Sequence, residues 1–187
     1  MLLTGVIEYC MLLGKDRQFL SCLKAGVSLP HYNGKGYLVL STGNKTEVAL
    51  GYCTLYGDMS GGLAVIGDLN KERVYNLAGY INTKENKELI PETIIERPPS
   101  AELTANQTDE NSIGIPYSIL VPLVDDIVEG MSHVDLLEKY KEKHVDKVKK
   151  MIKVAEYKRR QAPPSIKVTK KSFGIGRRIP MSHGYEK

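Results

Sequence analysis

Short apolar runs alternate with helix-capping signals in the middle of the chain. Residues 37–40 (YLVL) are four apolar positions between turn signals, the pattern of a short strand buried on both faces of a parallel sheet. Asn44, followed three residues later by Glu47, predicts a capping box for a helix that ends near Gly51. Residues 63–69 (LAVIGDL) predict a second strand or extended stretch. This alternation indicates a layered α/β fold.

Helical patterns dominate the rest of the chain. Asn70 is the expected cap of a helix whose apolar residues recur at 3- and 4-residue spacing on one face: Val74, Leu77, Ala78 and Ile81. Pro116 suits the first turn of another helix, which Pro122 is expected to strain or delay. The inward residues of that helix would be Ile119, Leu120, Leu123 and Val124. Ser132 starts a further short helix. The last amphipathic helix is marked by Val145, Val148, Met151, Ile152 and Ala155.

These patterns divide the chain into three parts. Residues 1–32 form a divergent segment that we expect to be helical, 33–160 form the main domain, and 161–187 form a basic, irregular tail. Residues 90–103 (IPETIIERPPSAEL) are expected to be a loop around two prolines, and 105–112 (ANQTDENS) an exposed polar stretch.

Charge is distributed unevenly along a chain of otherwise ordinary composition. Hydrophobic residues make up 42% and charged residues 26% of the 187, and the net charge is +4. Residues 135–187 carry 16 Lys and Arg against 6 Asp and Glu, whereas 1–134 carry 10 against 16. A basic tail suggests an anionic ligand, nucleic acid or an acidic partner, although a solvated helix face accounts better for its helical part.

The cysteines and the N-terminus favour a cytoplasmic protein. The chain has three cysteines, an odd number: Cys10, Cys22 and Cys53. No Cys or His is spaced from them as zinc ligands are, so reduced thiols are expected. The first apolar run lacks a basic start and is interrupted by Glu8, which argues against a signal sequence. No stretch approaches the ~20 apolar residues that span a bilayer, so no membrane association is expected.

The segment after the first predicted strand is the best candidate site from residue types alone. In open parallel sheets ligands bind at the carboxyl ends of strands, and residues 42–47 lie there. A backbone that turns into a helix at this point presents N–H groups that attract phosphate or carboxylate.

Several long motifs occur in an order that resembles one enzyme family. They are LSTGNKTEVALGYCTLYGDMSGGLAVIGDLNKERVYNLA, IPETIIERPPSAEL with NQTDENS, AEYKRRQAPPSIKV and FGIGRRIP. Together, over about residues 33–180, they resemble the carboxyl-terminal part of the synthetase domain of glutamine-dependent NAD+ synthetase. The resemblance implies an adenine nucleotide alpha hydrolase-like fold, a partial doubly wound parallel sheet with a helix-rich C-terminal half.

The resemblance also implies a ligase reaction. ATP adenylates the nicotinate carboxylate of deamido-NAD+, and ammonia derived from glutamine then displaces AMP to give NAD+. Mg2+ is the implied cofactor, because it offsets phosphate charge.

Site residues follow from the family positions that this sequence matches. The resemblance places Thr42, Lys71 and Ser100 at ATP, with Ser100 in the position of a threonine in the short enzymes. It places deamido-NAD+ against Glu47, Met59, Ser60, Gly61, Gly62 and Lys158. Glu47 is also the implied Mg2+ ligand, although helix capping alone would explain it. Without the resemblance, Lys71 would pass for an exposed lysine and residues 59–62 for an ordinary turn. No catalytic side chain is implied.

The departures from the family pattern are substantial. The sequence has no SGGxDS loop, which cradles the ATP phosphates in the family, and no nitrilase-like glutaminase domain. We therefore expect a truncated product, a fragment or one piece of a split enzyme that is inactive alone. Missing parallel strands favour a homo-oligomer or association with the missing half. The alternatives are a non-catalytic nucleotide-binding remnant and a nucleic-acid-binding protein. The last is disfavoured, because residues 147–178 contain only Tyr157 and Phe173 for stacking on bases.

Overall fold

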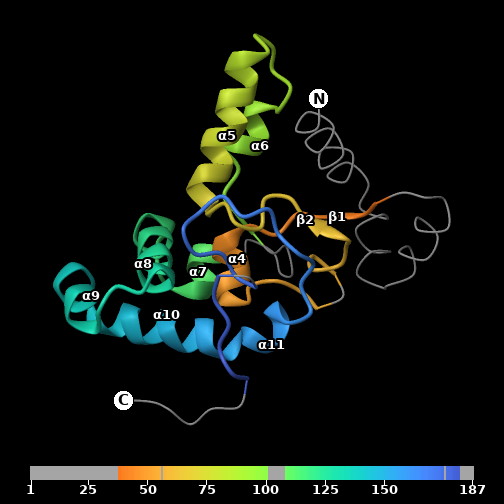
Figure 1. Cartoon of the computed structure of the whole chain (residues 1–187). Coiled ribbons are helices and arrows are strands. Elements are labelled where there is room, and N and C mark those ends of the chain that lie inside the picture. The colour runs from red at the N-terminus through yellow and green to blue at the C-terminus, as the bar shows by residue number, and fades with distance from the viewer. Residues whose placement is uncertain (1–37, 56, 101–107, 175, 182–187) are drawn as a thin grey trace.

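The computed structural model describes residues 38–55, 57–100, 108–174 and 176–181, in which helices surround a small parallel sheet (Figure 1). The helix predicted within residues 1–32 lies outside the described residues. The elements in chain order are β1 (Leu40–Ser41), α4 (Lys45–Leu50), β2 (Leu63–Ala64), α5 (Lys71–Lys84), α6 (Glu92–Ile95), α7 (Asp109–Ile113), α8 (Tyr117–Glu129), α9 (His133–Lys139), α10 (Glu142–Val154) and α11 (Glu156–Arg159). The predicted α/β fold with a helix-rich C-terminal half is confirmed.

The two predicted strands pair in parallel, although each is shorter than its apolar run. Leu40 is opposite Leu63, and Ser41 is opposite Ala64. Ala64 also donates its N–H to Pro164 O at 2.9 Å, so the C-terminal segment joins the other edge of β2. The start of the YLVL run extends past the paired region, where Leu38 is 59% exposed. Hydrophobicity marked the location of β1, but backbone pairing sets its length.

Both ends of α4 have the local signals that the sequence predicts. The side chain of Asn44 accepts the Glu47 N–H at 3.0 Å, and Glu47 Oε2 accepts the Asn44 N–H at 3.1 Å, which confirms the capping box. The helix ends at Gly51 with φ 67°. A Cβ at Gly51 would lie 2.6 Å from Cβ of Ala155, so glycine is required there by both backbone conformation and packing.

Helix α5 projects from the rest of the molecule with α6 beside it (Figure 1). Asn70 caps it as predicted, accepting the Arg73 N–H at 2.8 Å. Of its apolar face only Ile81 is buried, and the other three members are half-buried. The periodicity identified the helix correctly, but this helix contributes little to the main core. The expected proline loop at 90–103 contains the short helix α6.

The main core forms between α4, α8 and α10. Its fully buried members include Leu120, Leu123, Val124, Val145 and Val148, all at predicted inward positions. Such burial, at roughly 1.5–3 kcal/mol per large aliphatic side chain, is the main stabilising contribution here. In Figure 1, α10 runs beneath α4 and continues into α11.

The proline expectations for α8 need one correction. Pro116 is the N-cap residue, one position before the first helical residue. Pro122 neither delays nor ends the helix, which runs from Tyr117 to Glu129 through it. Pro122 is exposed, so its ring projects away from the core and the missing hydrogen bond lies on the solvent side. Ser132 caps α9 as predicted.

A buried ion pair fixes the C-terminal segment to the start of α4. Lys45 Nζ lies 3.3 Å from Asp68 Oδ1, and both side chains are at most 2% exposed. The same ammonium donates to Thr169 Oγ1 at 2.7 Å and to Lys171 O at 2.9 Å. Asp68 also accepts the backbone N–H groups of Val168 and Thr169 at 2.8 and 2.7 Å. Every charged oxygen and nitrogen of the pair therefore has a partner, as burial requires.

We predict that Asp68→Asn lowers the free energy of unfolding by about 3–5 kcal/mol at pH 7, because Lys45 is then left without its counter-charge. Burial raises the pKa of Asp68, but the hydrogen bonds from residues 168 and 169 and the Lys45 charge outweigh it and hold the pKa below its usual 3.8. The stabilisation is thus present above about pH 4 and is lost as pH falls through the lowered pKa.

Urea unfolding of wild type and variant from pH 7 to pH 2.5 measures this difference. The exposed Asp146→Asn is the control. The two curves should converge at low pH, and a difference that stays constant with pH would contradict the role of the Asp68 charge.

Candidate active site

The predicted site residues form two groups, one where β1 leads into α4, and one made of residues 59–62, just before β2, together with Lys158. The first group consists of Thr42, Glu47 and Lys71, at the N-terminal ends of α4 and α5. Thr42 directly follows β1 and is exposed. Because the N-terminal ends of helices carry partial positive charge, this location suits an anionic ligand.

Glu47 and Lys71 form an ion pair at the centre of the first group. Lys71 Nζ lies 2.8 Å from Glu47 Oε1, and their side chains are 17% and 20% exposed. Lys71 N–H also donates to Thr46 Oγ1 at 3.2 Å, which joins the start of α5 to α4. Burial would lower the pKa of Lys71, but the charge and hydrogen bond of Glu47 outweigh it and the pKa is raised. The ammonium is therefore fully charged at neutral pH.

Tyr117 and Asp109 complete this cluster and were missed by the sequence analysis. Lys71 Nζ lies 5.8 Å from the centroid of the Tyr117 ring, within cation–π range. The Tyr117 hydroxyl donates to Asp109 Oδ2 at 3.0 Å. Burial and then Asp109 raise the pKa of Tyr117, so the hydroxyl stays protonated. The only sequence signal for Asp109 was its place in a polar stretch that had been expected to be exposed, whereas it is buried.

Ser100 lies next to this cluster along the chain. The preceding carbonyl, Pro99 O, accepts the Asp109 N–H at 2.9 Å, which brings the residue 98–100 segment to the start of α7. Ser100 itself is half-buried. Of the segments that carry the three residues expected at ATP, α5 contacts α4 through Lys71 and Glu47, and the 98–100 segment contacts the start of α7.

Gly61 and Gly62 allow the loop at 57–62 to pack closely against β1. Gly61 has φ 153°, and a Cβ there would lie 2.9 Å from Val39 O. Gly62 donates its N–H to Val39 O at 2.8 Å. The backbone that approaches Gly61 is therefore that of β1, a local reason for glycine that needs no ligand. Ser60 is half-buried, and Met59 is 6% exposed.

Lys158 caps the end of α4. Its Nζ donates to Gly51 O at 2.7 Å and to Cys53 O at 2.8 Å. Two of the three ammonium hydrogens of Lys158 are thus donated to carbonyls. One hydrogen remains for the predicted contact with deamido-NAD+ while the side chain keeps this position. The next residue, Arg159, has even less freedom, because its guanidinium is buried and bound to Glu156 and to carbonyls of α4 and α10.

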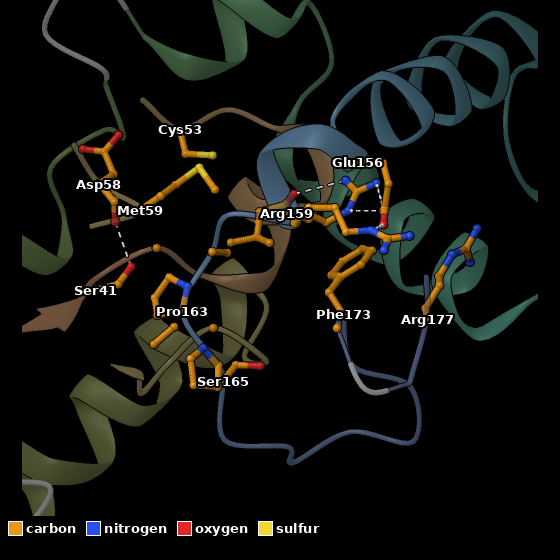
Figure 2. A pocket seen from close by; sticks show the side chains of 18 of the residues that line it. Ser41, Cys53, Asp58, Met59, Glu156, Arg159, Pro163, Ser165, Phe173 and Arg177 are labelled. Carbon is orange, nitrogen blue, oxygen red and sulfur yellow. Dashed lines mark hydrogen bonds and ion pairs between the residues drawn. The ribbon is translucent and has the colours of Figure 1, made fainter. Parts of the chain in front are cut away.

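A cavity of about 280 Å³ lies between β1, α11 and the C-terminal segment. Figure 2 shows Ser41, Cys53, Asp58 and Met59 along one side, and the Glu156–Arg159 pair with Phe173 and Arg177 along the other. Among the predicted site residues, Met59 lines the cavity. Gly43, which follows Thr42, lines it too.

Cys53 lies where the two groups of site residues meet. Burial raises the pKa of its thiol to about 11; Lys158 opposes the rise, and Asp58 and Glu47 add to it. Glu47 of the first group and Lys158 of the second thus both act electrostatically on one thiol.

The Mg2+ implied for Glu47 fits the donor chemistry of the first group in part. Carboxylate oxygens are the ligands that Mg2+ prefers, and Glu47 and Asp109 supply them. Asp109 Oδ1 is buried and has no hydrogen-bond donor in the described ranges. Glu47, however, is engaged at both oxygens, by Lys71 and by the Asn44 N–H. Within the same ranges no three His, Cys, Asp or Glu side chains are placed to hold a metal.

Comparisons with known proteins identify the family. A family model described as NAD synthase matches residues 19–162. The chain belongs to the NAD synthase family. The match begins inside the segment 1–32 that the sequence analysis set apart, and that division stays a prediction.

Relatives and solved structures agree with this family. The chain is similar to the glutamine-dependent NAD(+) synthetase of Synechocystis sp., with 42% identity over 155 residues that cover 82% of this chain and 27% of the relative. The Xanthomonas campestris enzyme of the same name is 44% identical over 163 residues, covering 86% and 29%.

The solved structure of a glutamine-dependent NAD(+) synthetase from Cytophaga hutchinsonii has a TM-score of 0.63 at 21% identity, covering 83% of this chain and 26% of that one. An NMN synthetase from Francisella tularensis has a TM-score of 0.56 at 22% identity, covering 82% and 60%. These two likenesses establish the fold. The chain spans less than a third of the length of these curated relatives.

The helices of the described ranges do not have the dimensions of a membrane span. None of them is both long enough and apolar enough to cross a bilayer.

The surroundings of Cys53 predict slow alkylation. Raising the pKa from 9.0 to about 11 lowers the thiolate fraction at pH 8 by about a hundredfold. Iodoacetamide should therefore label Cys53 in the folded chain at least about a hundredfold more slowly than in the same chain unfolded in urea. Peptide mass spectrometry separates Cys53 from Cys10 and Cys22. Equal rates at pH 8 would contradict the raised pKa of this half-buried thiol.

Proposed function

We propose that this chain forms part of the synthetase site of a glutamine-dependent NAD+ synthetase, an ATP-dependent carbon–nitrogen ligase. The observation that carries the proposal is the cluster around Lys71, which joins residues from α4, α5, α7 and α8 within a chain of the NAD synthase family. The family match supports the reaction class, and the cluster supports a site for an anionic nucleotide.

The proposed reaction has two steps. A carboxylate oxygen of the nicotinate ring of deamido-NAD+ attacks the α-phosphorus of ATP, and pyrophosphate leaves. Ammonia, derived from glutamine, then attacks the acyl carbon, AMP leaves with the carboxylate oxygen, and the nitrogen loses a proton as the amide forms. Mg2+, when bound, would offset the negative charge of the phosphates.

Residues around α4 would bind and orient the two nucleotides. Lys71 would pair with ATP phosphates, and Thr42 and Ser100 would add hydroxyl donors. Glu47 would lie where the two nucleotides meet and hold Mg2+. Met59 and the loop through Gly62, together with Lys158, would contact deamido-NAD+, for which the cavity beside Met59 offers room.

Part of the site must come from outside this sequence under this proposal. The SGGxDS loop that cradles phosphates in the family does not occur in it. We infer that the missing half of the synthetase domain supplies this loop, that the chain forms a homo-oligomer or associates with that half, and that the reaction takes place in the cytoplasm. A nucleotide-binding remnant without catalysis is the second candidate, favoured by the engagement of Lys158 with the carbonyls of Gly51 and Cys53, just after α4.

The first test is ammonia-dependent NAD+ formation by this polypeptide alone, followed by an enzymatic cycling assay. We expect no turnover, because half of the phosphate-binding surface is lacking. A full-length glutamine-dependent synthetase serves as the positive control. Measurable NAD+ formation by the chain alone would refute the expectation of an incomplete site.

Isothermal titration with ATP and with deamido-NAD+ separates the two candidate functions. A synthetase site binds both ligands, whereas a remnant binds ATP alone. Lys71→Met should weaken ATP binding about tenfold or more, because a charge-assisted phosphate contact is lost. The control is Lys84→Met, an exposed lysine at the other end of the same helix. Equal losses in both variants, or binding of neither ligand by the wild-type chain, would contradict the proposed site.

A further inference from the structure

The cluster around Lys71 contains two carboxylates and one ammonium. Glu47 contacts the ammonium directly at 2.8 Å. Asp109 joins the cluster through Tyr117, whose hydroxyl lies 3.0 Å from Asp109 Oδ2. Tyr117 connects the two sides, since its ring lies below the ammonium and its hydroxyl binds Asp109. The cluster therefore carries one negative charge that no cation of the described residues balances by contact.

Asp109 is the group whose bonding is incomplete. Its side chain belongs to a residue that is only 4% exposed, and its Oδ1 is buried without a donor among the described residues. Among the described residues, Oδ2 has one donor, the neutral Tyr117 hydroxyl. A buried carboxylate oxygen that meets neither water nor a donor costs free energy, so native proteins retain such an oxygen mainly where a ligand or ion supplies the missing partner.

We propose that Glu47 and Asp109 form a divalent-cation site, which Lys71 keeps closed until an anion draws its ammonium away. Asp109 is the new member of this site. The inference rests on the proposed function for the nature of the anion, the phosphates of a nucleotide. The donors are hard carboxylate oxygens, so the cation is of the Mg2+ or Mn2+ class.

Charge balance explains why the cation and the phosphate would have to bind together. A divalent cation that arrives alone meets the Lys71 ammonium at Glu47, and like charges repel. A phosphate that arrives alone draws the ammonium away and leaves two carboxylates without a cation. When both arrive, Lys71 moves to the phosphate and the cation takes its place beside the carboxylates. Binding of the cation and of the phosphate is therefore expected to be cooperative.

The test measures Mn2+ binding to the full chain by electron paramagnetic resonance, without nucleotide. Lys71→Ala removes the ammonium and opens the space, and should bind Mn2+ at least about tenfold more tightly than wild type. Adding Asp109→Asn to this variant should reverse the gain about tenfold or more. The control substitution in the same background is the exposed Asp146→Asn, which should change nothing. Circular dichroism melts confirm that each variant is folded.

If the variant that combines Lys71→Ala with Asp109→Asn does not fold, Tyr117→Phe in the Lys71→Ala background takes its place in the test. It removes the donor to Asp109 Oδ2, and a carboxylate that ligates the cation should then bind it more tightly.

Two outcomes overturn the proposal. If Lys71→Ala binds Mn2+ no more tightly than wild type, the lysine closes no cation site. If neither Asp109→Asn nor Tyr117→Phe changes the affinity of Lys71→Ala, Asp109 is not a ligand, and its oxygen serves only to accept a hydrogen bond. Because no nucleotide is present, these outcomes are independent of the ATP and deamido-NAD+ titrations that test the proposed function.

Discussion

The buried guanidinium of Arg159 holds the short helix on which the candidate site is built. Helix α4 has six residues, far fewer than an isolated helix needs for stability in water. Arg159 Nη1 donates to Ala49 O at 2.7 Å, and its Nη2 binds Ile152 O of α10. Its Cζ atom lies 4.7 Å from the centroid of the Phe173 ring. The helix that carries Glu47 is therefore held by groups more than 100 residues later in the chain.

Other basic residues of the C-terminal part also donate hydrogen bonds to helix carbonyls. Lys147 donates to Ile113 O at the end of α7, and Lys171 donates to Glu129 O at the end of α8. Arg177 binds two further carbonyls of α8, and Lys158 caps α4. Cations at the C-terminal ends of helices complement both free carbonyls and the helix dipole. Much of the positive charge that suggested an anionic ligand thus stabilises helices, which leaves Lys71 as the clearest anion-binding candidate.

The features that the sequence predicted correctly are local ones. The caps at Asn44, Asn70 and Ser132 were recognisable because each depends on residues three positions apart. The Lys45–Asp68 pair was not, since its partners and Thr169 are distant in sequence and form a contact only in the folded chain. Asp109 was missed for a related reason: its burial depends on the packing of α7 against the 98–100 segment and Tyr117. Family motifs supplied the positions of Lys71 and Glu47, which spacing alone would have left as a surface lysine and a helix cap.

Hydrogen exchange of the α4 amides in Arg159→Met, compared with Arg160→Met, tests this account most directly. Both arginines pair with Glu156, but Arg159 is buried and bound to α4, whereas Arg160 is exposed. We predict that Arg159→Met speeds exchange across residues 48–52 while Arg160→Met leaves it near the wild-type rate. Unchanged protection of those amides in Arg159→Met would show that α4, and the site at its start, does not depend on the C-terminal half.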